Sequence, residues 1–136
     1  MKNKSTYEGL QEHVRKFKTP GIEVWRNQYS DRDYFVKIET DEFTSICPKT
    51  GLPDFAAIKV EYVPDKWCVE LKSFKLYLIS YRNVGIFHEH VTSRILDDLV
   101  KASKPRFMRI EMEYKPRGGI KTSTKAEHIR KGYKLK

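Results

Sequence analysis

The sequence has few cysteines and lacks the short motifs by which small proteins hold metals or nucleotides. Only Cys47 and Cys68 occur among its 136 residues, and neither C-x-x-C nor H-x-x-x-H is present. These absences argue against a disulfide framework and against a self-contained zinc knuckle. No G-x-G-x-x-G occurs either, so a dinucleotide-binding Rossmann unit is not expected.

Long apolar runs are also missing. No stretch approaches the roughly 20 residues that cross a bilayer. The beginning, Met1–Lys–Asn–Lys, lacks the apolar segment and small-residue cleavage site of a secretion signal. We therefore expect a cytoplasmic protein without membrane contact, whose thiols stay reduced.

Length and charge indicate one domain with a basic end. The chain is 39% hydrophobic, which suits a single modest core. Its net charge is +9, and residues 115–136 contain eight Lys or Arg against one acid. Such an end is typical of a solvated tail, although it could bind a polyanion such as RNA or a phosphorylated cofactor. We expect a flexible arm over 1–20, a catalytic domain over 21–123 and a basic tail over 124–136.

The hydrophobic pattern predicts four strands and two helices. Alternation indicates strands over 34–40, 55–63 and 106–114, with a short fourth one around Ile120. Apolar residues three and four apart predict two helices, over 70–82 on Leu71, Phe74, Leu78 and Tyr81, and from Phe87 onward on Val91, Ile95 and Leu99 until Pro105.

The resulting order, β-β-α-α-β-β, favours an α+β fold. One antiparallel sheet would carry both helices on one face. Because its edges would stay open in a monomer, we expect several copies to complete a ring or barrel.

The first chemical candidate is the segment from Phe43 to Asp54, which reads as an irregular loop. Pro48 follows Cys47 and interrupts any backbone ladder, so the thiol can face a cleft. A thiolate is the reactive form, and Lys49 could favour it, while Asp54 is a candidate proton donor. The alternative is an inert structural cysteine.

Three further clusters of polar residues are candidate chemical sites, and each also has a simple structural interpretation. The run Glu70–Leu–Lys–Ser–Phe–Lys75 sets a carboxylate and two ammonium groups at a helix start, where a simple N-cap is the other interpretation. His88–Glu–His90 is weak as a metal site, because residues two apart on a helix face different directions and a third ligand is not evident. Pro116–Arg–Gly–Gly119 is a basic turn suited to phosphate, or merely a turn.

Together these segments resemble a known family. The match runs from about Phe43 to Ile120, and the arm and tail lie outside it. It resembles the NADPH-dependent 7-cyano-7-deazaguanine reductases, the nitrile reductases of queuosine biosynthesis, in their short single-domain form. The motifs that carry it are Glu70–Leu–Lys–Ser–Phe–Lys75, Cys47–Pro–x–Thr–Gly51, Pro53–Asp–Phe55, Phe87–His–Glu89 and Pro116–Arg–Gly–Gly119.

The resemblance implies a tunnelling fold (T-fold) that assembles into an oligomeric barrel, a decamer of two stacked rings, with sites between subunits. Cys47 would attack the nitrile carbon to give a thioimide, and Asp54 would supply a proton. Two hydrides from NADPH would then give 7-aminomethyl-7-deazaguanine. The resemblance also assigns the rest of the site: Val69, Glu70, Leu71, His88 and Glu89 to the substrate, Lys72, Lys75 and Arg117 to NADPH, with no metal and no requirement for nucleic acid.

Three rivals remain open at this point. A GTP cyclohydrolase of the same fold would bind zinc, but its second cysteine ligand is lacking, and Cys68 suits a small buried hydrophobe better. An amidine-forming relative acts on a tRNA-borne base without reductant and would not need Lys72 and Lys75. A plain RNA-binding module would act through residues 115–136, although no aromatic recognition motif supports it.

Overall fold

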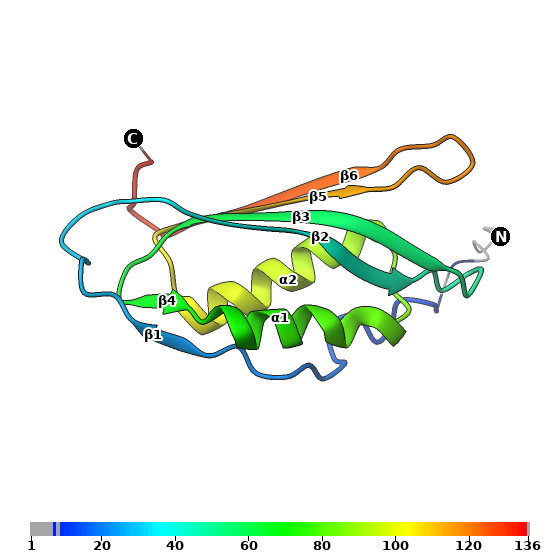
Figure 1. Ribbon diagram of the computed structural model, residues 1–136, viewed down its shortest axis with the longest axis horizontal. Coiled ribbons are helices and arrows are strands. Elements are labelled where there is room, and N and C mark those ends of the chain that lie inside the picture. Colours follow the sequence, from blue (N-terminus) through cyan, green and yellow to red (C-terminus); the bar gives the residue numbers. More distant parts are fainter. Residues whose placement is uncertain (1–6, 8, 136) are drawn as a thin grey trace, which may run out of the picture.

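A computed structural model describes residue 7 and residues 9–135, in which one antiparallel sheet carries two helices. The strand order is β2-β3-β5-β6. Figure 1 shows α1 and α2 on the same side of this sheet. The predicted α+β class with both helices on one face is confirmed. The bounds are β2 Val36–Ile46, β3 Pro53–Val63, α1 Leu71–Ile79, η1 Ser80–Asn83 (a 3-10 helix), α2 His88–Ser103, β5 Phe107–Tyr114 and β6 Ser123–Ile129.

The core lies between the sheet and the helices. Successive strand residues point to opposite faces, so alternation along β3 and β5 sends one set of side chains inward. Lys59 and Glu61 face away from the helices, together with Glu111 of β5. The inward set of these two strands is buried: Ala56, Ile58, Val60, Tyr62, Met108, Ile110, Met112 and Tyr114.

Strand β2 is longer than predicted because it contains a bulge. The pairing with β3 shifts between Thr40 and Phe43. A bulge adds a residue, so the inward side chains change from even to odd numbers, and the apolar alternation breaks in the sequence. The predicted end at residue 40 is therefore wrong. The expected loop from Phe43 to Asp54 shrinks to residues 47–52, and Asp54 lies in β3.

Both helices form where predicted, with defined ends. The Glu70 carboxylate accepts hydrogen bonds from the backbone N–H groups of Lys72 and Ser73 and so caps α1. Helix α2 ends at Ser103, and its C-cap residue Lys104 has a left-handed φ of 47° just before Pro105. Leu71, expected on the inner stripe of α1, is exposed instead. No helix in the described part of the chain is long and apolar enough to cross a membrane.

A second, two-stranded sheet was not predicted. It pairs β1 (Val24–Arg26) with β4 (Trp67–Val69). Three residues are too few for periodicity to reveal a strand. The Glu70 N–H donates to the Glu23 carbonyl, so this small sheet fixes the start of α1.

Described residues of the expected arm and of the expected tail pack against the domain. In the expected arm, Val14 is buried and Arg94 donates hydrogen bonds to the carbonyls of Val14 and Phe17. In the expected tail, β6 occupies Ser123–Ile129, where the fourth strand was predicted only around Ile120. Beyond β6, Arg130 pairs with Asp65 at 2.5 Å. The low hydrophobicity of both segments hid these contacts.

Candidate active site

The loop that carries Cys47 is closed by its own backbone. Cys47 N–H donates to the Leu52 carbonyl at 2.9 Å, and Gly51 N–H donates to the Cys47 carbonyl at 2.8 Å. Gly51 has φ of 73°, a left-handed conformation in which glycine is favoured. The thiol is half-buried. A parallel bridge from Ile46 to Gly85 places this loop beside the start of α2.

The environment of Cys47 favours its thiolate. Burial acts to raise the pKa of the thiol, and the Asp54 carboxylate acts in the same direction. Hydrogen bonds from the Thr50 hydroxyl and from the N–H groups of Thr50 and Lys49 outweigh both effects, so the Cys47 pKa lies below its ordinary value of 9.0. The activating groups are therefore local donors, and Lys49 contributes through its backbone rather than its ammonium group.

Asp54 is a buried carboxylate with two partners. It is only 3% exposed and lies opposite Ser45 in the β2–β3 pairing. Arg117, on the turn between β5 and β6, donates to Asp54 Oδ1 at 2.5 Å. His88 Nε2 lies 3.0 Å from the other oxygen, Oδ2. The hydrogen bond to Asp54 raises the pKa of Arg117, and Cys47 adds to this effect, so cation, carboxylate and thiol form one cluster.

The first turn of α2 adds an aromatic stack. The His88 ring stacks on Tyr114, with centroids 3.6 Å apart and planes at 9°. Burial raises the pKa of Tyr114, and the carboxylates of Asp54 and Glu89 act in the same direction. Glu89 is thus close enough to this ring to influence it. His88 turns toward Asp54 while His90 Nδ1 contacts Gln11 at 2.7 Å, which confirms that the two histidines face different partners.

Two site residues were missed from the sequence. Among the described residues, the buried hydroxyls of Ser45 and Tyr114 have no hydrogen-bond partner. Both lie at the ends of strands, on the face that also carries Asp54. Period-2 alternation would have placed Tyr114 inward, but the bulge in β2 concealed Ser45.

The remaining predicted residues do not join this cluster. Glu70 caps α1 at the end next to β4, and Lys72 and Lys75 are exposed on that helix. Helix α1 runs from β4 toward the end of the sheet where Cys47 lies (Figure 1). Its nine residues alone span about 14 Å. Within one chain, the segment from Val69 to Lys72 is therefore separate from the thiol.

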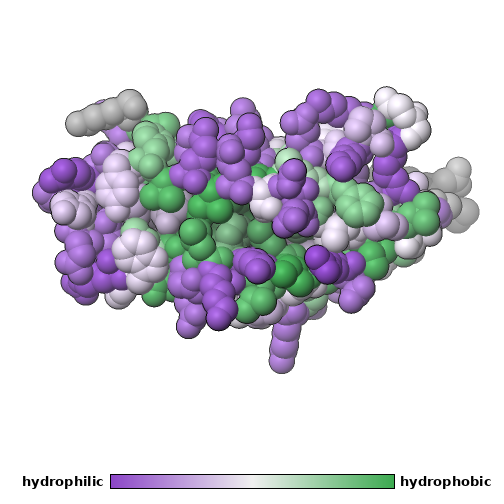
Figure 2. Space-filling view, in the orientation of Figure 1, coloured by the Kyte–Doolittle hydropathy of each residue, from purple (hydrophilic) through white to green (hydrophobic). Residues whose placement is uncertain are grey.

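An apolar groove lies between β2 and α1. Its cavity measures about 360 Å³. Apolar side chains gather along this face between the sheet and α1, with hydrophilic residues around them (Figure 2). Lys75 and Arg82 supply positive charge at this groove, and Glu42 supplies one negative charge. The apolar lining consists of Ile38, Phe43, Leu71, Phe74, Leu78 and Ile79.

Metal coordination has no evident site. In the described part of the chain, no three His, Cys, Asp or Glu side chains are placed to hold one ion together.

Known proteins with similar sequences cover most of the chain. A family profile described as "QueF-like protein" matches residues 53–133. The NADPH-dependent 7-cyano-7-deazaguanine reductase of Chloroherpeton thalassium is 57% identical over 107 residues, which are 79% of this chain and 92% of that protein. The enzyme of the same name from Chlorobaculum tepidum is 61% identical over 99 residues, 73% of this chain and 85% of that protein.

A solved structure has the same fold. The apo form of an archaeosine synthase QueF-Like aligns with a TM-score of 0.64 at 26% identity, covering 68% of this chain and 91% of that one. Profile, sequence relatives and fold agree, and the chain belongs to the family of QueF-like proteins, among which are the NADPH-dependent 7-cyano-7-deazaguanine reductases.

Proposed function

We propose that this protein is an NADPH-dependent nitrile reductase that converts 7-cyano-7-deazaguanine to 7-aminomethyl-7-deazaguanine in queuosine biosynthesis. The observation that carries the proposal is a cysteine of lowered pKa beside the buried Asp54, which His88 and Arg117 contact. Relatives at 50–61% identity with the reductase name support the same activity.

The first step uses only side chains of this chain. The Cys47 sulfur attacks the nitrile carbon, one π bond of C≡N opens, and the nitrogen takes a proton from Asp54. The product is a thioimide. His88 Nε2, 3.0 Å from Asp54, can return a proton to that carboxylate. The balance needs a thiolate, which the hydrogen bonds to Cys47 favour, and a proton donor, a role that we assign to Asp54 because it is buried and in contact with His88.

Base recognition falls to the start of α2. The guanine-like edge offers an N–H and an amine, and a carboxylate accepts both. Glu89 is exposed in the first turn of α2, next to His88 in sequence and close to the buried Tyr114 ring. We assign the base to Glu89 and His88, with Val69, Glu70 and Leu71 of a neighbouring copy completing the pocket.

The residues present fit a phosphorylated dinucleotide. The groove between β2 and α1 combines an apolar lining with Lys75 and Arg82. Lys72 and Lys75 would hold phosphate as point charges, and Arg117 would do so with its forked guanidinium. Two molecules of NADPH, bound in turn, would supply one hydride each, and the C–S bond to Cys47 would break between the two transfers, so that the free thiol and the amine are formed. Arg117 contacts Asp54 here, so phosphate binding would compete with that carboxylate.

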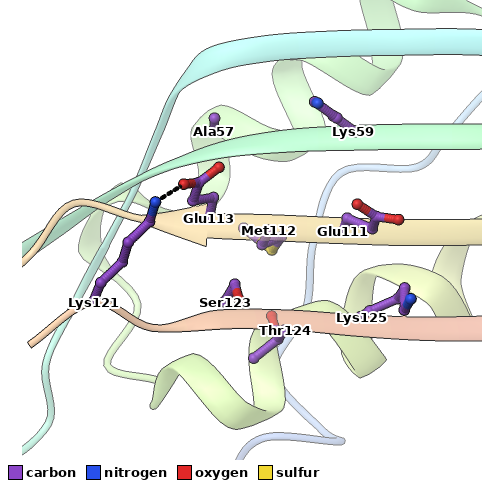
Figure 3. Close-up of a pocket in the computed structure, with 9 residues that line it drawn as sticks. All are labelled: Ala57, Lys59, Glu111, Met112, Glu113, Lys121, Ser123, Thr124 and Lys125. Atoms are coloured by element: carbon purple, nitrogen blue, oxygen red, sulfur yellow. Dashed lines mark ion pairs between the residues drawn. The ribbon is translucent and has the colours of Figure 1, made fainter.

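The proposed site residues lie toward opposite ends of α1, so a second copy is needed to bring the two groups together. Across the outer face of the sheet, charges alternate in two rows, Lys37, Glu61, Arg109, Glu127 and Glu39, Lys59, Glu111, Lys125. Figure 3 shows part of this face, where Lys121 also pairs with Glu113. Strands β2 and β6 are the open edges and run antiparallel.

One register continues the alternation into the next copy. Pairing Glu127 with Lys37 of a neighbouring copy also pairs Lys125 with its Glu39, because antiparallel partners change by equal steps in opposite directions. Both contacts join opposite charges. This supports a ring of copies joined edge to edge, and we propose a decamer of two stacked rings as the complete assembly. The reduced thiol that the chemistry needs supports a cytoplasmic location.

Intact-protein mass spectrometry tests the activity directly. Incubation with the nitrile base should add the mass of one base per chain, and NADPH should remove it as the amine appears. Cys47→Ala should prevent the adduct, while the matched variant Cys68→Ala, at a buried position, should keep it. An adduct that ammonia rather than NADPH discharges would instead favour the amidine-forming relative. Absence of any adduct on wild-type protein would reject the proposal.

A further inference from the structure

The chain before β1 reaches the start of α2, where the base-binding residues lie. Gln11 Oε1 accepts a hydrogen bond from the Phe87 N–H at 3.3 Å and lies 2.7 Å from His90 Nδ1. His13 Nε2 lies 2.6 Å from the Gly85 carbonyl. Phe87 is the N-cap residue of α2 and its side chain makes no capping hydrogen bond. A carboxamide from a distant segment thus contacts the backbone just ahead of the helix.

These contacts hold the first turn of α2 from two sides. His88 is tied to Asp54, and His90 is tied to Gln11. Consecutive helical residues are rotated by about 100° from one another, so the two tethers lie on different sides of the helix axis. Glu89 lies between them. Fixing both neighbours holds the backbone at Glu89, and with it the direction in which its side chain leaves the helix.

A buried network anchors the same segment. The Arg94 guanidinium donates to the carbonyls of Val14 and Phe17 and lies 4.1 Å above the centre of the Phe17 ring. Its Nε donates to Asp98 at 2.8 Å, and Asp98 accepts from the Tyr77 hydroxyl. Arg94 belongs to α2 itself. The segment is therefore attached both to the first turn of α2 and to its second.

The segment also contacts the loop of the nucleophile. The Lys49 ammonium lies 5.2 Å from the centre of the Tyr7 ring, and this ring packs against Phe87 at 5.3 Å. Lys49 is two residues from Cys47. Tyr7 thus contacts both the loop of Cys47 and the N-cap residue of α2.

We propose that residues 9–17 form a strap that positions the first turn of α2, with Gln11 as the positioning residue for Glu89 and His88. The inference rests on the proposed function for what Glu89 binds. The strap lies outside residues 53–133, which match the family profile. Gln11 touches the backbone of the site and His90, so its effect reaches the ligand only through Glu89 and His88.

The test compares three variants of the full-length chain. Gln11→Ala removes the acceptor, Gln11→Glu keeps an oxygen at the same position, and Glu12→Ala is the matched control at the exposed neighbouring residue. The first measurement is hydrogen exchange of residues 86–90 in the free protein. The second is the concentration of nitrile base that gives half-maximal adduct by intact mass.

For Gln11→Ala we expect exchange at Phe87 to accelerate about fivefold and the half-maximal concentration to rise by a similar factor, as the loss of one hydrogen bond implies. The rate at which NADPH clears a saturated adduct should stay within about twofold of wild type, because Gln11 does not touch the reacting atoms. Gln11→Glu should restore both values, and Glu12→Ala should leave both unchanged.

If hydrogen exchange at Phe87 were the same in Gln11→Ala as in wild type, the proposal that the strap docks on α2 through Gln11 would be wrong. Faster exchange with an unchanged half-maximal concentration would overturn the positioning role. Failure of Gln11→Glu to restore the values would show that the acceptor oxygen is not the active group. If wild-type protein forms no adduct, the proposed function fails and the positioning role with it, whereas the exchange measurement still reports separately whether the strap docks.

Discussion

At the scale of single residues, the reactivity of Cys47 is decided by a short loop. The pKa of the thiol is lowered although burial and Asp54 both act against the thiolate. The compensation comes from Thr50 and from two backbone N–H groups that the turn at Gly51 directs to the sulfur. The pair Cys47 and Asp54 could be found in the sequence from residue type and spacing. The contact of Arg117 with Asp54 joins residues 63 positions apart and could not.

Thr50→Val tests the hydroxyl contribution. Thiolate forms as pH rises through the pKa, so a lowered pKa gives wild-type Cys47 an alkylation midpoint below pH 9.0. Without the hydroxyl donor, the midpoint should move up, and alkylation at neutral pH should slow several-fold. Iodoacetamide labelling across pH, read by intact mass, measures it. Cys68 is 3% exposed and should stay unlabelled in the folded protein. A midpoint that does not move would assign the activation to the backbone alone.

Asp54→Asn tests the proton donor. The amide keeps the size of the side chain but cannot deliver a proton, so adduct formation should slow by about 10²-fold or more. Binding of the base, measured by calorimetry on a Cys47→Ala background, should change little. Asp41→Asn, on the exposed bulge of β2, is the matched control. If the variant formed the adduct at the wild-type rate, the proton donor would be His88 and not Asp54.

At the scale of elements, helix ends and the β2 bulge set the position of the site. The bulge moves Ser45 to the inner face beside Asp54, and the cap at Glu70 starts α1 immediately after β4. Local spacing predicted both helices, because each helix buries a stripe of apolar residues that recur three or four positions apart. A bulge has no such signature. It is defined by two strands together, and the residue it adds looks like a break in the pattern.

Lys104→Gly tests the C-cap of α2. Lys104 has φ of 47°, where a side chain carries a steric cost that glycine avoids. The variant should be more stable by about 1 kcal/mol. Lys101→Gly, one turn earlier in regular helix, should lose about 1 kcal/mol as the opposite control. Urea unfolding at one fixed protein concentration measures both, since assembly would otherwise shift the midpoint. Destabilisation by Lys104→Gly would contradict the strained cap.

At the scale of the whole molecule, the open sheet edges at β2 and β6 and the proposed division of the site both favour an assembly of several copies. On the outer face of the sheet, positive and negative side chains alternate and balance one another. Most of the basic residues there lie opposite acidic residues of the neighbouring strand. The surplus charge that suggested a free basic tail is thus partly used in β6 and in the pair of Arg130 with Asp65. Lys131 and Lys134 remain exposed beyond the sheet.

A charge exchange across the proposed edge contact tests the ring. Lys37→Glu should weaken assembly because Glu127 of the neighbouring copy would meet a like charge, and Glu127→Lys should do the same. The double variant should recover part of the loss. Each exposed pair contributes about 1 kcal/mol or less, but closure of a ring multiplies the effect. Light scattering after size exclusion measures the mass. A wild-type protein that elutes only as the 16.1 kDa monomer would exclude the ring.

The sequence by itself predicted both helices and strands β3 and β5, and it indicated Cys47 and Asp54 as candidate reacting groups. These features depend on residues close together in the chain, whose spacing and chemistry are visible without a partner. Only the tertiary structure decided that Arg117 and His88 meet at Asp54, that Tyr114 stacks on His88, and that residues 9–17 lie against α2.

The distinction between local pattern and tertiary contact also explains why the two motifs of the proposed site lie apart. Glu70 at the start of α1 and the motif around Cys47 are both present in one chain, yet α1 separates them by its length. Sequence records which groups exist, whereas their distances depend on long-range pairing between strands and helices. Contacts across a large loop leave no local periodicity, because the residues that form them are constrained by one another and not by their neighbours in the chain.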